Sequence, residues 1–370
     1  MMKASARRRR GKWDWVEGYE TSRQEGQDGV VGLSFDLSTL AEKGYLGKRV
    51  FTRFKEATGL ADFAWRVVYS RRSWGGPIAR KEILGRAQGF VIFIHGWDGS
   101  GEIWESLPAM VCQRNPRLVA FVLDVNGFGG SPFVPEEAEM PEVARCSPEA
   151  CMRAVEKWIE TMKLRGRKGT KRIFTFVGHS MGGAALFYMD DKDWAEDRYA
   201  RCAVAPALLC NDVLRRGFYV GLGASIGAGR QYALLDIVKE MLAPRLINEL
   251  ISGASEAVKA EHLRIFEKTS KGTLAQTFYA LGQAEKPGQR RWWKNFRVIL
   301  GHKDRLVGVA PMLNLLEDLG FRTENIRVVL GDHYLFSSGL KTRRSHGENR
   351  DILLEEILQL HEGCRTGQKG

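Results

Sequence analysis

The sequence lacks the features that mark membrane-spanning, disulfide-linked and zinc-binding proteins. No stretch reaches about 18 apolar residues, the length that a membrane-spanning helix needs. The six cysteines form no C-x-x-C pair and no framework spacing, no cysteine–histidine cluster suits zinc, and no internal repeat is present. We therefore expect free thiols in a reducing compartment, with no metal and no cofactor.

The first twelve residues contain no acid, and six of them are Lys or Arg. They contribute to a formal net charge of +12. We interpret residues 1–30 as a basic, flexible arm; the alternative is weak association of this arm with anionic surfaces. No aromatic–basic pattern of an RNA-binding module accompanies it, so we expect no specific nucleic-acid partner. No apolar segment follows the arginines, which argues against a secretory signal and predicts a cytoplasmic protein.

The rest of the chain alternates apolar runs with amphipathic segments. Hydrophobic residues make up 44% of the 370, enough for a large core. Strands are predicted at 63–70, 89–94, 118–123, 171–176, 201–206, 295–300 and 325–330, helices at 48–57, 147–159, 311–320 and 350–360, and a turn at 73–77. Apolar strands separated by helices predict an α/β fold with a mostly parallel, doubly wound sheet.

Residues 207–288 interrupt this alternation. They lack long apolar strands and carry helical patterns, which predicts an inserted helical cap between core segments 31–206 and 289–370. An apolar set in the cap is expected either to line a substrate pocket or to pack the cap against the core: Leu222, Ile226, Tyr232, Leu234, Leu235, Met241, Phe278 and Tyr279.

One strand-to-helix turn carries the sequence Gly178-His-Ser-Met-Gly182. An apolar run precedes it and an apolar helical segment follows, which is the context that makes a G-x-S-x-G motif informative. So tight a turn strains its central residue and leaves room only for glycine two positions before and after. The turn therefore presents the Ser180 hydroxyl at the end of the sheet, next to a helix N-terminus that favours negative charge.

Five polar residues follow the predicted strands directly: His95, Asp124, Ser180, Asp304 and His333. In a parallel α/β sheet the carboxyl ends of the strands meet at one edge, where ligands bind. We therefore expect these side chains to share one site.

The chain order Ser180, Asp304, His333 suits a nucleophile, an acid and a base. A serine hydroxyl needs a base within hydrogen-bond reach, and that base needs an orienting acid. Asp212, after the strand at 201–206, is the alternative acid. Asp332 is expected to cap the turn beside His333.

The other histidines are assigned to supporting or surface positions. His302 is predicted in a loop beside the acid, and His262 on the surface of the cap, with substrate contact as its alternative. His346 and His361 fall in polar or terminal segments.

These motifs together resemble the α/β-hydrolase superfamily over residues 60–362. The resemblance rests on His95-Gly96-Trp97, Asp124-x-x-Gly127-x-Gly129-x-Ser131, Gly178-His-Ser-Met-Gly182, Gly301-x-x-Asp304 and Gly331-x-His333. It implies a helical cap between the sixth and seventh strands of the fold. It also implies that the backbone N–H groups of Trp97 and Met181 form an oxyanion hole. His95 and His179 are assigned to the substrate-binding region as braces of the two oxyanion loops.

A serine at the turn argues against epoxide opening and halide displacement, for which relatives use aspartate. The sequence thus predicts a cofactor-free serine hydrolase of carboxylic esters, with an ester-like small molecule carrying an apolar group as substrate. The alternatives are a carbon–carbon bond hydrolase or acyltransferase of the same fold, and a non-catalytic ligand-binding protein.

Overall fold

The structure is a computed structural model of the whole chain. It describes residues 24–25, 30–70, 87–165, 172–190, 194, 198–229, 248, 251–288, 295–337 and 343–366. Several predictions lie outside these residues: the arm up to residue 23, the turn at 73–77, and the cap positions Tyr232, Leu234, Leu235 and Met241.

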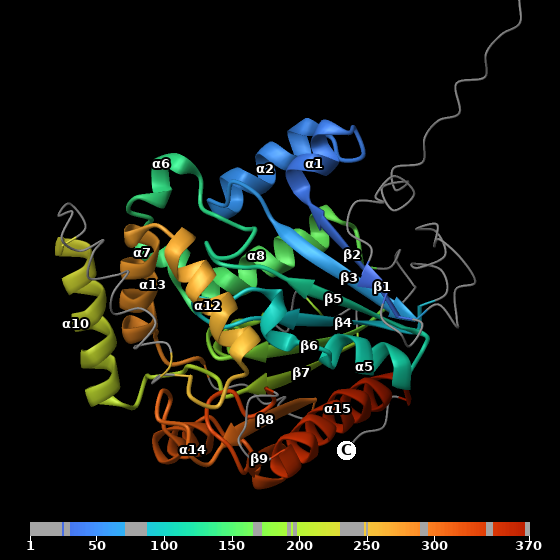
Figure 1. Cartoon of the computed structure of the whole chain (residues 1–370), viewed down its shortest axis with the longest axis vertical. Helices are drawn as coiled ribbons and strands as arrows, with labels where there is room; N and C mark the ends of the chain where they lie inside the picture. Colours follow the sequence, from blue (N-terminus) through green and yellow to red (C-terminus); the bar gives the residue numbers. More distant parts are fainter. Residues whose placement is uncertain are drawn as a thin grey trace, which may run out of the picture.

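The described residues form one sheet of nine strands in the order β1-β2-β3-β5-β4-β6-β7-β8-β9 (Figure 1). The strands are β1 (Gln24–Glu25), β2 (Val30–Asp36), β3 (Ala64–Ser70), β4 (Gly89–Ile94), β5 (Leu118–Leu123), β6 (Ile173–His179), β7 (Arg198–Val204), β8 (Phe296–Gly301) and β9 (Ile326–Val329). In sheet order, all neighbouring strands from β5 through β4 to β9 are parallel. At the other edge, β1, β2 and β3 are antiparallel to their neighbours. The predicted mostly parallel sheet is confirmed.

Helices cover both faces of this sheet (Figure 1). The core helices are α1 (Leu37–Glu42), α2 (Lys48–Thr58), α5 (Leu107–Arg114), α6 (Pro135–Ala138), α7 (Val143–Cys146), α8 (Pro148–Thr161), α9 (Met181–Ala185), α14 (Val309–Asp318) and α15 (Arg343–Thr366). Short 3₁₀ turns occur at Gly101–Trp104, Leu186–Tyr188 and Thr323–Asn325. Helices α5 and α15 lie on one face, and α8 lies on the other.

Helix α8 shows how the local sequence fixes the core. Ser147 precedes it, and the Ser147 hydroxyl accepts a hydrogen bond from the Ala150 N–H at 3.1 Å, as the sequence predicts. Its Trp158 is fully buried, with ring centroids 5.5 Å from Trp65 and 5.3 Å from Phe121 on the sheet. This aromatic packing holds α8 against the sheet at strands β3 and β5.

Between β7 and β8 the described residues form helices and no strand. These are α10 (Val213–Gly229), α12 (Glu256–Lys268) and α13 (Lys271–Gln283), and α10 packs along α13. In Figure 1 they stand beyond the carboxyl ends of the parallel strands. No helix in the described part of the chain is long and apolar enough to cross a membrane. None of the six cysteines is in a disulfide, as expected.

Two expectations about the chain ends need correction. Gln24 and Glu25, which were placed in the arm, pair with β2. Helix α15 begins at Arg343 and ends at Thr366, well beyond the predicted 350–360. The 350–360 segment carries the apolar stripe, whereas the polar turns on either side show no helical periodicity of their own.

Candidate active site

Ser180 lies at the sharp turn between β6 and α9. It has φ of 52° and ψ of −116°, a left-handed backbone conformation that is uncommon for a residue with a side chain. A Cβ on Gly182 would lie 2.5 Å from the carbonyl oxygen of His95, and a Cβ on Gly178 would collide with the Gly182 backbone. The flanking glycines are therefore required by close approach, and the strained turn predicted from the sequence is present.

His333 and Asp304 form a buried pair at the ends of β9 and β8. The His333 Nδ1 donates to the Asp304 Oδ2 at 2.8 Å, and both side chains are under 10% exposed. The other carboxylate oxygen accepts the N–H groups of Leu306 and Val307 at 2.9 and 3.1 Å. Burial by itself raises the pKa of Asp304, but the facing imidazole and these hydrogen bonds outweigh it and hold the pKa below its ordinary value. Asp304 is therefore an anion that fixes the His333 ring.

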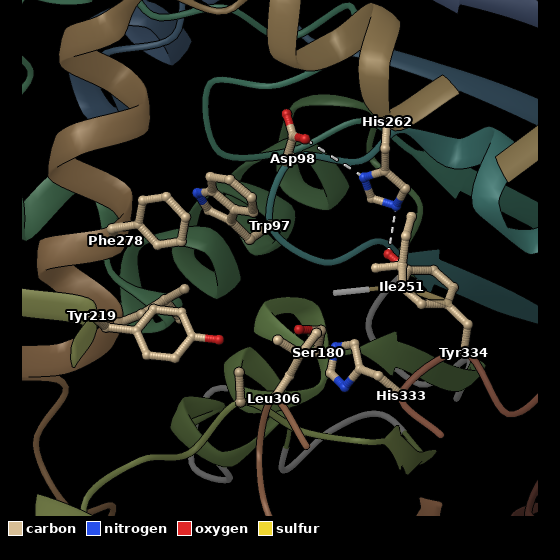
Figure 2. Close-up of a pocket in the computed structure, with 12 residues that line it drawn as sticks. Trp97, Asp98, Ser180, Tyr219, Ile251, His262, Phe278, Leu306, His333 and Tyr334 are labelled. Atoms are coloured by element: carbon tan, nitrogen blue, oxygen red, sulfur yellow. Dashed lines mark hydrogen bonds and ion pairs between the residues drawn. The ribbon is translucent and has the colours of Figure 1, made fainter. Parts of the chain in front are cut away.

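Ser180 and His333 lie side by side on the wall of one cavity (Figure 2). Both are nearly buried, at 8% and 5% exposed. No hydrogen bond joins the two side chains in the part of the chain that the structure describes. Catalytic hydrogen bonds are often long without substrate and shorten in the reacting complex. The arrangement gives a hydroxyl, an imidazole and a carboxylate in the order that nucleophilic catalysis needs.

Asp212, the alternative acid, is engaged elsewhere. Its side chain pairs with the Arg215 guanidinium, and its Oδ1 accepts the Arg215 N–H at 3.0 Å. It does not line the cavity. Asp332 accepts the N–H of Tyr334 at 3.0 Å, as expected of a residue that caps the turn.

The predicted oxyanion residues lie on either side of Ser180. Met181 is the first residue of α9, and Trp97 follows Gly96 in the loop after β4. A Cβ on Gly96 would lie 2.7 Å from the Ser180 Cβ, so this loop runs directly against the nucleophile. Neither the Trp97 nor the Met181 N–H donates to another group among the described residues. Both amides are therefore available to an oxyanion.

His95 holds the loop that carries Trp97, and His179 holds the backbone of the proposed base His333. His95 is fully buried; its Nε2 accepts the Val125 N–H at 2.9 Å and its Nδ1 donates to the Gly96 carbonyl at 2.6 Å. The His179 Nε2 donates to the His333 carbonyl at 3.0 Å. Burial lowers the pKa of His95 to about 4, so the ring is neutral. Neither of these two predicted substrate-binding residues is among those that line the cavity.

The cavity has a volume of about 60 Å³. It is lined by Trp97, Asp98, Ser180, Ala207, Tyr219, Ile251, His262, Phe278, Leu281, Leu306, His333 and Tyr334. Of the described members of the predicted apolar set, Phe278 lines the cavity, and Leu222, Ile226 and Tyr279 do not. In Figure 2, the rings of Trp97, Phe278 and Tyr219 form an aromatic wall from which the Tyr219 hydroxyl points toward Ser180, and the Trp97 and Phe278 ring centroids are 4.0 Å apart.

The surface position predicted for His262 is wrong. His262 is 4% exposed and lines the cavity. It lies on the buried face of α12 together with Val258, Ile265 and Phe266. That i, i+4, i+7, i+8 spacing is visible in the sequence and was the signal that could have placed His262 inside.

Comparisons with known proteins agree with this architecture. Three solved structures resemble it: an esterase from Thermogutta terrifontis, a bromoperoxidase from Bacillus anthracis and the esterase EaEST from Exiguobacterium antarcticum. Their identities are 15, 16 and 11%, their TM-scores 0.52, 0.53 and 0.52. The matches cover 74, 80 and 91% of this chain, and 91, 95 and 99% of the respective structures. At such identities the likeness shows the fold alone.

A search of curated proteins found no match. A family model described as the alpha/beta hydrolase family matches residues 91–339. This range runs from β4 to the residues just after His333 and covers more than half of the chain. The chain therefore belongs to the alpha/beta hydrolase family.

Proposed function

We propose that this protein is a serine hydrolase that cleaves carboxylic esters through an acyl-enzyme. The observation that carries the proposal is the buried 2.8 Å hydrogen bond between His333 and Asp304, beside a serine held at φ of 52°. A strained turn that exposes a hydroxyl next to an oriented imidazole is the arrangement that activates serine.

The reaction begins with attack of the Ser180 oxygen on the ester carbonyl, while His333 Nε2 takes the hydroxyl proton. Asp304 keeps the other proton on Nδ1 and stabilises the imidazolium. The tetrahedral oxyanion accepts the N–H groups of Trp97 and Met181. Collapse breaks the carbon–oxygen bond, and His333 returns the proton to the departing alcohol. Water, deprotonated by His333, then attacks the acyl-enzyme and releases the carboxylic acid and Ser180.

The helices between β7 and β8 act in this proposal as the cap predicted at 207–288. Phe278 of α13 and Tyr219 of α10 supply part of the aromatic wall, which faces Ser180 across the cavity. A wall of aromatic rings favours a hydrocarbon part of the substrate.

The test is hydrolysis of a chromogenic ester series of increasing acyl length, with Ser180→Ala measured in parallel. We expect turnover that Ser180→Ala abolishes, and labelling of Ser180 by a fluorophosphonate probe. Absence of both turnover and labelling would reject the activated nucleophile and favour a ligand-binding protein. Labelling without ester turnover would keep the triad and direct the search to carbon–carbon cleavage or acyl transfer.

A further inference from the structure

A second polar cluster, separate from the proposed triad, lines the cavity. The His262 Nε2 and the Tyr334 hydroxyl are hydrogen-bonded at 2.5 Å, and the His262 Nδ1 is 3.7 Å from the Asp98 Oδ2. The three side chains are 4%, 3% and 1% exposed. Figure 2 shows the three linked in a row, from Asp98 beside Trp97 through His262 to Tyr334, which lies across the cavity from Phe278 and Tyr219. We call His262, Tyr334 and Asp98 the polar wall.

The polar wall is assembled from three separate parts of the chain. His262 comes from α12, Asp98 from the loop after β4, and Tyr334 follows the proposed base directly. The proposed triad uses none of these side chains. Burying three polar groups costs free energy that an apolar trio would not, and His262 is the polar member of the otherwise apolar buried face of α12. A role in the cavity explains why polar groups stand here.

The polar wall keeps hydrogen-bonding capacity that faces the cavity. Burial, and then the charge of Asp98, raise the pKa of Tyr334 well above its ordinary value, so its hydroxyl stays protonated. A phenol offers one donor and two acceptor sites, and the bond with His262 uses one of them. If Nδ1 alone carries the imidazole proton, Tyr334 donates to Nε2 and keeps acceptor sites. If Nε2 carries the proton, Tyr334 accepts and keeps its donor.

The charges around the cavity restrict which substrate group can bond to the free hydrogen-bonding sites of Tyr334. No Lys or Arg is among the described residues that line the cavity, and Asp98 stands in the polar wall. Among these lining residues a substrate carboxylate would find no cationic side chain to pair with. A hydrocarbon group would leave the remaining donor or acceptor sites of the Tyr334 hydroxyl unused. A hydroxyl group both donates and accepts, and therefore suits the polar wall whichever way the bond between Tyr334 and His262 runs.

We propose that the polar wall is a specificity subsite for a hydroxyl group that the substrate carries close to its ester bond. Tyr334 contacts that hydroxyl, and His262 and Asp98 orient Tyr334. The proposal rests on the proposed function, because the ester carbonyl must lie at Ser180. The substrate class is thus an ester with a hydroxyl at one side and a hydrocarbon part against Trp97 and Phe278.

The test uses two matched ester pairs in which a methyl group replaces the hydroxyl. On the acyl side these are aryl esters of 3-hydroxybutanoate and 3-methylbutanoate; on the alcohol side, 2-hydroxypropyl and 2-methylpropyl butanoate. We expect the hydroxyl ester of at least one pair to have about tenfold or more the kcat/KM of its methyl partner, because a site built for a hydroxyl rejects an analogue without it.

Three variants assign this preference to the polar wall. Tyr334→Phe keeps the ring and removes the hydroxyl, and His262→Leu removes the imidazole; each is expected to bring the hydroxyl-to-methyl ratio near one. Phe278→Leu, on the opposite wall, is the matched control and is expected to change both esters of a pair alike. Fluorophosphonate labelling of Ser180 and thermal unfolding verify that each variant is folded.

The outcomes separate this inference from the proposed function. Turnover of both esters at equal kcat/KM in both pairs overturns the hydroxyl subsite and leaves the serine hydrolase intact. A hydroxyl preference that persists in folded Tyr334→Phe and His262→Leu also overturns it. Absence of all turnover and of labelling rejects the proposed function, and the subsite with it.

Discussion

The Nδ1 of His333 donates to the Oδ2 of Asp304 at 2.8 Å, across the loops that follow two adjacent parallel strands. The sequence separates these residues by 29 positions. They meet because β8 and β9 pair in register and end at the same edge of the sheet. The carboxylate is fixed on its other side by two backbone N–H groups, so the imidazole is held in one orientation.

We expect Asp304→Asn to lower kcat/KM for a chromogenic ester about a thousandfold or more. The amide cannot hold the proton on His333 Nδ1, and the ring loses the anion that stabilises its charged form. Asp212→Asn is the matched control, because this residue pairs with Arg215 away from the cavity. If Asp304→Asn kept near-normal activity while a folded Asp212→Asn was inactive, the acid of the triad would be Asp212 instead of Asp304.

We expect Gly96→Ala to lower kcat about a hundredfold while leaving the protein folded. The added Cβ would stand 2.7 Å from the Ser180 Cβ, so the loop must move and carry the Trp97 N–H away from the oxyanion position. Gly221→Ala, on α10 with nothing within 4 Å of the new Cβ, controls for the substitution itself. Kinetics with thermal unfolding measure both. Full activity of Gly96→Ala would place the oxyanion donor elsewhere.

Trp97 also joins the oxyanion loop to helix α13, because its Nε1 donates to the Thr277 Oγ1 at 2.9 Å. Thr277→Val keeps the shape and removes the acceptor. We expect it to lower the free energy of unfolding by about 1–3 kcal/mol, since a half-buried indole N–H loses its partner. In a protein that already carries Trp97→Phe, Thr277→Val should cost much less, because the indole donor is absent. Urea unfolding of the parent, the two single variants and the double variant measures this difference. Additive losses would show that the bond does not couple the two residues.

The buried histidines predict acid sensitivity of the fold. His361 is 1% exposed, its Nδ1 is 3.1 Å from the Thr175 hydroxyl, and burial lowers its pKa to about 4. The unfolded chain binds this proton near pH 6.5, so the stabilisation is complete above that pH and is lost as the pH falls from 6.5 to 4. The slope per such histidine is about 1.4 kcal/mol per pH unit.

His361→Gln should therefore reduce the pH dependence of stability over this range by about that slope. Urea unfolding between pH 5 and 7 measures it for both proteins. The remaining slope in the variant is expected to include His95, whose pKa burial also lowers to about 4. Identical slopes for the two proteins would contradict the assignment.

The sequence predicted those elements whose signals are local. Helix α2 ends before Gly59, which has φ of 72°, and the apolar run at 89–94 is strand β4 in full. Strand β2 was missed because Gly32 and Ser34 interrupt its apolar pattern, and only its pairing with β3 reveals it. Ser180, Asp304 and His333 could be predicted to lie near one another because each comes within a few residues of the end of a parallel strand.

By itself, the sequence determined the order of the strands along the chain, the strained serine turn and the strand-end positions of His333 and Asp304. These depend on periodicity and glycine spacing within short segments. Only the tertiary structure decided that Asp304, not Asp212, contacts His333, and that His262 joins Tyr334 and Asp98 in the cavity. Both relationships cross from one element to another, so they depend on strand register and on how helix α12 packs over the sheet's edge, which no local pattern records.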